Sequence, residues 1–217
     1  MSTKRIVLAS VSPRRLDLLR ATGFEVVCDP SGVAEIESGF SSPHELALVN
    51  AGLKWQAVAI RHKEILVSAD TVVWGNNKFY GKPRDLIEAK LMLNELGGRT
   101  HEVVTGVVVG IPGGRVESFA ESSRVTFRAI DEVFIDSYLK SINPLDKAAG
   151  YAAQGDGGRL ISALEGSLTN VIGLPMERLG EVLASKFGVL PSALAAIDEC
   201  RGEIIKNNGA FLDGRKN

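Results

Sequence analysis

The stretch ILVSADTVV (65–73) is a nearly continuous run of apolar and β-branched residues. Such a run predicts a strand that is buried on both faces. Asp70 stands inside the run, and a buried carboxylate is costly unless a cation or hydrogen bonds satisfy it. Mg²⁺ is one cation that prefers carboxylate oxygens. The stretch therefore predicts the centre of a sheet and a candidate functional residue, although Asp70 could instead cap a neighbouring loop.

Helices and strands alternate on both sides of this stretch. Strand patterns occur at 6–9, 24–28, 78–80, 103–111, 116–128, 160–164 and 170–172. Helix patterns occur at 13–22, 43–61, 84–96, 131–142 and 175–187, with a capping box at Ser42–Glu45. The strands around Pro112-Gly113-Gly114 form a hairpin. We expect an α/β fold with a mixed, partly antiparallel central sheet flanked by helices.

Composition narrows the class of protein. The chain has 217 residues, 45% of them hydrophobic, and its net charge of −1 lacks the basic excess of a general nucleic-acid binder. Two cysteines, Cys28 and Cys200, indicate a reducing cytoplasm, and no apolar run is long enough to span a membrane. We expect one domain at 1–189, which could form two lobes around a cleft. A tail at 190–217 should contain a weak helix and a disordered end.

The segment Ser10–Arg15 is typical of an anion site. A strand ends there, and the free N–H groups and dipole of the following helix favour negative charge. Arg14 and Arg15 lie in the first turn of that helix, where a bound polyanion would offset their unfavourable position. Without a ligand, they would be two solvated surface arginines.

The remaining polar candidates indicate a functional site only in combination with other residues. Lys54 and Lys82, with the two arginines, supply four cations for a ligand such as a nucleoside triphosphate. Glu35 and Glu37 are ordinary loop acids unless one of them joins Asp70 at a metal. The amide of Gln154 can read the edge of a base, or it can bond to its own loop.

Several separate motifs occur in an order that is similar to one known family. They are LASVSPRRLDLL (8–19), SADTVV (68–73), GKPRD (81–85), GGRTHEVVTGV (97–107), VTFR (125–128), PLDKAAGYAAQG (144–155) and EGSLTNVIGLPME (165–177). Together they resemble the Maf family of nucleoside triphosphate pyrophosphatases, over nearly all of 6–188. No counterpart is recognised for the tail from Leu190.

The resemblance implies a fold shared with the inosine triphosphate pyrophosphatases, a homodimer, and hydrolysis of a nucleoside triphosphate to the monophosphate and pyrophosphate with Mg²⁺. It implies that Asp70 is the catalytic acidic residue, acting as proton acceptor or metal ligand, and that Glu35 is the other acidic residue of the site and a metal ligand. It places Ser10, Arg15, Lys54 and Lys82 at phosphate-contacting positions.

The resemblance also implies a base preference. Arg14, Thr71 and Gln154 match the group that acts on dTTP and UTP, whereas a second group, acting on 7-methyl-GTP, carries Glu at the last position. Because neighbouring residues face opposite sides of a strand, we expect a bulge or strand end near Asp70, so that Thr71 also reaches the ligand.

Two other functions are compatible with the sequence, and three positions depart from the family pattern. A low-turnover nucleotide-binding regulator of septum formation and a 7-methyl-GTP pyrophosphatase are the alternatives. Ala34 stands where the family usually has Asp, Trp55 replaces a small residue, and Ala149-Gly150 reverses the usual order.

Overall fold

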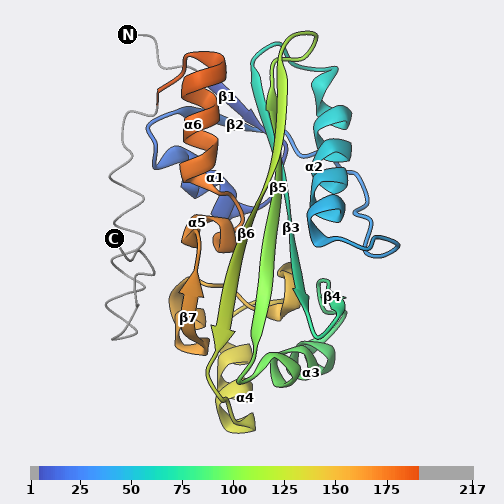
Figure 1. The fold of residues 1–217 in the computed structure, drawn as a ribbon, viewed down its shortest axis with the longest axis vertical. Helices are drawn as coiled ribbons and strands as arrows, with labels where there is room; N and C mark the ends of the chain where they lie inside the picture. The colour runs from blue at the N-terminus through green and yellow to red at the C-terminus, as the bar shows by residue number, and fades with distance from the viewer. Residues whose placement is uncertain (1–4, 191–217) are drawn as a thin grey trace.

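The computed structural model describes residues 5–190, whose centre is a seven-stranded mixed sheet (Figure 1). The strand order is β2-β1-β3-β5-β6-β7, and β4 pairs with β3 outside this path. The strands are β1 (Arg5–Leu8), β2 (Glu25–Cys28), β3 (Ile65–Gly75), β4 (Lys78–Tyr80), β5 (Thr100–Gly110), β6 (Val116–Phe127) and β7 (Ile161–Glu165). The α-helices are α1 (Pro13–Arg20), α2 (Pro43–Ala59), α3 (Leu86–Leu96), α4 (Glu132–Ser141), α5 (Leu168–Ile172) and α6 (Met176–Phe187). The predicted fold class is confirmed.

The strand β3 contains the predicted stretch 65–73 and lies in the middle of the sheet. It pairs in parallel with β1 only as far as Val67, and β4 joins the same side of β3 from Val73 onward. On its other side, β3 pairs continuously with β5. Within the described residues, the edge of β3 around Asp70 and Thr71 is therefore left without a neighbouring strand on one side.

The expectation of a bulge or a strand end near Asp70 is wrong for β3, which continues unbroken to Gly75. The register between β3 and β5 runs without a shift from Leu66 to Trp74. Asp70 faces α2, and Thr71 faces the opposite side of the sheet, where it bonds to Arg15. Both side chains reach one cavity because β1 ends early, so no distortion of β3 is needed.

The helix α2 packs against the sheet at a position where β5 carries a glycine. It packs across β3, β5 and β6, whereas α1, α5 and α6 lie on the other side (Figure 1). Gly106, the β5 partner of Asp70, faces the backbone of α2, and a Cβ there would lie 2.4 Å from the carbonyl carbon of Ala47. The missing side chain thus lets α2 cross the sheet directly over Asp70.

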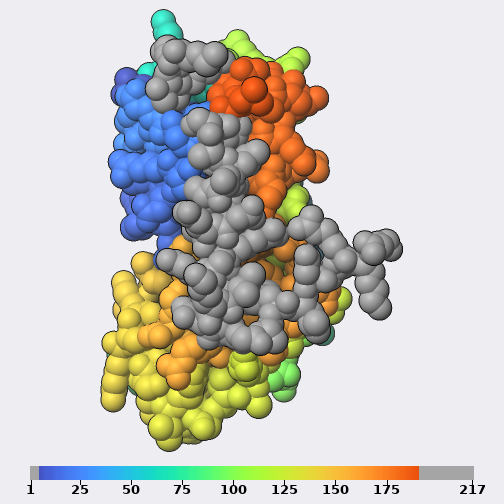
Figure 2. All heavy atoms as spheres, turned by 90° about the vertical axis from the view of Figure 1, so that its left-hand side faces the viewer, coloured from blue at the N-terminus to red at the C-terminus, as the bar shows by residue number. Residues whose placement is uncertain are grey.

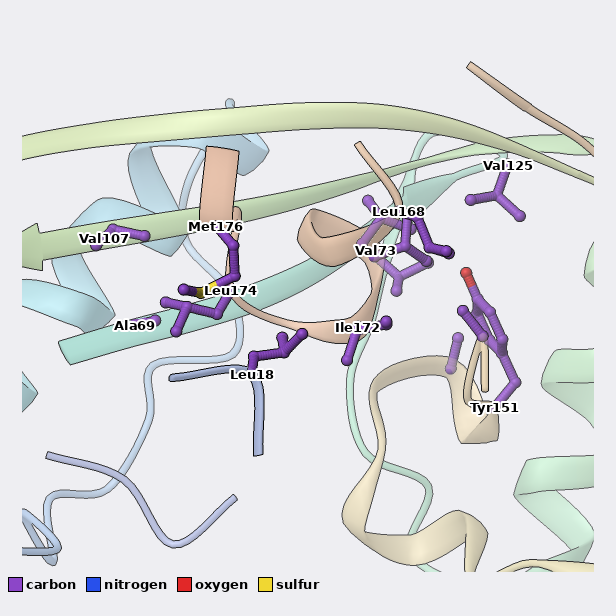
Figure 3. Close-up of a cluster of buried hydrophobic side chains, with 14 of the residues drawn as sticks. Leu18, Ala69, Val73, Val107, Val125, Tyr151, Leu168, Ile172, Leu174 and Met176 are labelled. Carbon is purple, nitrogen blue, oxygen red and sulfur yellow. The ribbon is translucent and has the colours of Figure 1, made fainter. Parts of the chain in front are cut away.

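The main hydrophobic core lies on the face opposite α2. Ala69 and Val73 of β3 belong to it together with Leu18 of α1 and Met176 of α6, and Figure 3 shows Ala69 near Leu174 and Val73 near Leu168. This burial fixes the alternation of β3, because a one-residue slip would move Ala69 and Val73 out of the core. Figure 2 shows that the blue segment after residue 4 and the orange-red helix α6 gather at one end of the molecule, with the yellow residues around α4 at the other.

Some local predictions are wrong or stay untested. The strand expected at 170–172 is the helix α5, because the Ser167 side chain accepts a hydrogen bond from the backbone N–H of Asn170 and caps it. Ser42 is the N-cap residue of α2, but its side chain makes no capping hydrogen bond. Beyond Leu190 the predicted tail lies outside the described residues. Within residues 5–190, no helix has the length and apolar character needed to cross a membrane.

Candidate active site

A cavity of about 690 Å³ opens at the uncovered edge of β3. That volume is within the usual range of small-molecule sites, about 300–1,000 Å³. The loop after β1, the loop around Glu35, α2, β3 and the segment 146–153 all contribute to its lining. The predicted site residues that line the cavity are Ser10, Arg14, Arg15, Glu35, Lys54, Asp70, Thr71 and Lys82.

Gln154 is placed differently from the rest of the predicted set. The lining of the cavity includes Ala152 and Ala153 but does not extend to Gln154. Gln154 is half-buried and precedes a 3₁₀ turn, Gly155–Leu160. Its role in reading a base therefore stays a prediction.

A chain of charges crosses one wall of the cavity. The ammonium nitrogen of Lys54 lies 2.6 Å from Asp70 Oδ1 and 2.7 Å from Glu35 Oε1. The ammonium nitrogen of Lys82 lies 2.6 Å from Glu35 Oε2. Lys54 and Asp70 are almost fully buried, whereas Lys82 is half-exposed at the rim. Burial alone would raise the pKa of Glu35, but the two lysines outweigh it and lower that pKa to about 2.

Asn50 is a site residue that the sequence reasoning missed. Its side-chain amide nitrogen donates to Asp70 Oδ2 at 3.0 Å and to the backbone oxygen of Ile36 at 2.9 Å. Its side-chain oxygen accepts from the backbone N–H of Ile36 at 2.8 Å. Asn50 thus ties the loop that carries Glu35 to the strand that carries Asp70. The signal available in the sequence was the spacing of four residues between Asn50 and Lys54, which places both on one helix face.

Arg15 forms the opposite wall of the cavity with its side chain fixed. Its Nε donates to the backbone oxygen of Gly173 at 2.7 Å, and its Nη2 donates to Thr71 Oγ1 at 3.0 Å. Gly173 has a φ of +126°, a backbone conformation that side-chain-bearing residues rarely adopt. Burial lowers the pKa of Arg15, and the carboxylates of Asp70 and Glu35 act against this shift. Arg14 is half-buried beside it.

Tyr151 adds a buried aromatic wall. It lines the cavity, and its hydroxyl group lies 2.7 Å from Nε2 of His101. Burial lowers the pKa of His101 to about 4 and raises the pKa of Tyr151, so both groups are neutral near pH 7. Figure 3 shows the Tyr151 ring beside the hydrophobic core. This side of the cavity is therefore suited to an uncharged part of a ligand.

Glu35 and Asp70 are the candidate ligands for a divalent metal ion. The described residues contain no group of three or more His, Cys, Asp and Glu side chains arranged to hold an ion. Glu35 and Asp70 nevertheless converge on one positive charge, the ammonium group of Lys54. Mg²⁺ is commonly held by one or two carboxylates together with phosphate oxygens and water. These residues fit such an ion when a triphosphate supplies further ligands.

The fold and the cavity define an α/β protein with a pocket lined by both cationic and acidic side chains. The family model described as Maf-like protein matches residues 5–186, and the chain belongs to this family. A dTTP/UTP pyrophosphatase from Pelotomaculum thermopropionicum is 43% identical over 187 residues, which cover 85% of this chain and 97% of that protein. A dTTP/UTP pyrophosphatase from Bacillus cytotoxicus is 42% identical over 179 residues, which cover 81% of this chain and 92% of that protein.

A solved structure, the Ham1 protein of Staphylococcus aureus, is similar with a TM-score of 0.44 and 17% identity. The similarity covers 73% of this chain and 80% of that chain.

Proposed function

We propose that this protein hydrolyses nucleoside triphosphates, with dTTP and UTP preferred, to the monophosphate and pyrophosphate. The observation that carries the proposal is the position of Asp70, buried between Lys54 and Asn50 and open to a cavity with several cationic side chains. The names of the relatives support the same reaction and the same two substrates. We extend the proposal to a homodimer in the cytoplasm that does not bind nucleic acid.

The proposed reaction breaks the bond between the α-phosphorus and the oxygen that bridges it to the β-phosphorus. Water attacks the α-phosphorus, Asp70 accepts the proton of the water, and pyrophosphate leaves with the bridging oxygen. Arg15, Lys54 and Lys82 offset the negative charge that develops on the leaving group. Glu35 and Asp70 are the residues that would hold a Mg²⁺ ion, which would add charge neutralisation beside the phosphates.

The experiment that tests the function uses a panel of standard and modified nucleotides with Mg²⁺. Pyrophosphate and monophosphate are measured for the unaltered protein, for Asp70→Asn and for Asp136→Asn, whose carboxylate makes a surface ion pair with Lys90. We expect pyrophosphate from dTTP and UTP, loss of turnover in Asp70→Asn, and normal turnover in Asp136→Asn. A folded Asp70→Asn variant with near-normal activity would show that Asp70 is not the catalytic carboxylate.

A further inference from the structure

We infer that Thr105 determines whether Thr71 can donate a hydrogen bond to the nucleotide or can only accept one from it. Thr105 is fully buried and does not line the cavity. The two threonines are direct partners on β5 and β3, and their hydroxyl oxygens are 2.9 Å apart. Thr105 has no exposed surface, whereas Thr71 is half-buried and lines the cavity. The inference rests on the proposed function and makes Thr105 a positioning residue.

The direction of each hydrogen bond follows from what its partners can do. Thr105 Oγ1 lies 3.0 Å from the backbone oxygen of Asn170, which has no hydrogen to give. The single hydroxyl proton of Thr105 must therefore point to Asn170. In its contact with Thr71, Thr105 can then only accept, so the hydroxyl proton of Thr71 is directed to Thr105.

Arg15 also forms a hydrogen bond with the hydroxyl group of Thr71. Its Nη2 donates to Thr71 Oγ1 at 3.0 Å, and a guanidinium group has no acceptor. The Thr71 oxygen thus gives its proton to Thr105 and one lone pair to Arg15. One lone pair remains for a ligand, so Thr71 can accept a hydrogen bond from the nucleotide but cannot donate one.

This polarity decides which part of the nucleotide Thr71 contacts. Phosphate oxygens are hydrogen-bond acceptors, so a contact between them and Thr71 would bring two lone pairs together. A donor group of the nucleoside is the matching partner. On uracil and thymine, the donor at the pairing edge is N3–H, whereas N3 of cytosine is an acceptor. We assign Thr71 to the N3–H group, which favours uracil and thymine over cytosine.

Two substitutions at Thr105 separate this role from a packing role. Thr105→Val keeps the shape but removes the acceptor for the Thr71 proton, so Thr71 becomes free to donate. Thr105→Ser keeps the hydroxyl group and is the matched control. The measurement is the ratio of kcat/KM for UTP to kcat/KM for CTP. We expect the unaltered protein to prefer UTP, Thr105→Val to lower the ratio about tenfold, and Thr105→Ser to retain it.

A second measurement needs no substitution and holds even if Thr105→Val does not fold. A UTP analogue in which a methyl group replaces the hydrogen on N3 removes the proposed donor. We expect its kcat/KM with the unaltered protein to be about tenfold below that of UTP.

Several outcomes would overturn the inference while leaving the pyrophosphatase function intact. The first is equal kcat/KM for UTP and the analogue. The second is an unaltered protein that does not discriminate between UTP and CTP. The third is a folded Thr105→Val variant in which kcat/KM falls equally for both substrates. Failure of the proposed function is distinguishable, because the unaltered protein would then release no pyrophosphate from any nucleotide.

Discussion

The ammonium nitrogen of Lys54 lies 2.6 Å from Oδ1 of Asp70, and both side chains are almost fully buried. The same nitrogen also contacts Glu35, so one cation holds two carboxylates in place. Removing one member of a buried ion pair leaves an uncompensated charge, which commonly costs about 3–5 kcal/mol. Lys54 should therefore contribute both to the stability of the fold and to the positions of Asp70 and Glu35.

Lys54→Met should lower kcat/KM by about two orders of magnitude or more, because it removes the cation that orients Asp70 and Glu35. The matched control is Lys78→Met, which removes a surface ion pair with Glu95. Exposed pairs contribute little, so the control should retain activity and nearly full stability. Equal, small effects of the two substitutions on kcat/KM and on thermal unfolding would contradict the role given to Lys54.

The low pKa of Glu35 predicts an acid-dependent loss of stability. In the folded protein this pKa is lowered from 4.5 to about 2. A depressed carboxyl pKa contributes stability that is fully present above the unfolded value and is lost as the pH falls through the folded one. We expect the free energy of unfolding to decrease between about pH 4.5 and pH 2. Denaturant titrations should show a smaller decrease in Glu35→Gln, and an identical decrease would rule out this source.

Asn50→Ala should lower kcat/KM by about tenfold to a hundredfold, because it frees the loop at Ile36 and removes one donor to Asp70. Asn94→Ala is the matched control, since Asn94 is exposed on α3 and donates to the backbone oxygen of Lys90. Steady-state kinetics of the two variants decide the matter. If Asn50→Ala keeps the kcat/KM of the unaltered protein, the link between the loop and Asp70 has no catalytic importance.

Gln154→Glu should depress turnover of UTP and raise activity on 7-methyl-GTP, because a carboxylate pairs better with a cationic methylated purine than with a pyrimidine edge. The measurement is the ratio of kcat/KM for UTP to that for 7-methyl-GTP in both proteins. If the substitution leaves this ratio unchanged, or if the unaltered protein prefers 7-methyl-GTP, the assigned base preference is wrong. The proposed pyrophosphatase reaction would not be affected by either result. Since Gln154 lies just beyond the lining of the cavity, this result also tests whether its segment moves when a ligand binds.

Patterns of apolar residues predicted most of the fold. The run 65–73 is long and β-branched, and it forms the strand on which the site is built. The hairpin around Pro112 was equally clear, because its turn residues separate two long strand patterns. The short apolar run at 170–172 was misassigned to a strand. Its conformation depends on the cap from Ser167 and on side-chain hydrogen bonds from Asn170 to β5 and β6.

The predicted site residues came from charges in unusual places and from the family resemblance. The structure brings eight of them to one cavity, although their roles in binding and catalysis stay predictions. Asn50 and Thr105 were missed because neither is charged and the family resemblance assigns a role to neither. Their importance depends on hydrogen bonds between residues far apart in the sequence, such as Asn50 with Ile36 and Asp70. Local sequence patterns carry no information about such distant contacts.

The most direct test of the central claim is hydrolysis of UTP in water labelled with ¹⁸O, with products identified by mass spectrometry. Attack on the α-phosphorus predicts UMP and pyrophosphate in equal amounts, with the label in UMP, and loss of both products in Asp70→Asn. Formation of UDP and labelled orthophosphate as the main products would contradict the account, because the reacting phosphorus would then be the γ-phosphorus.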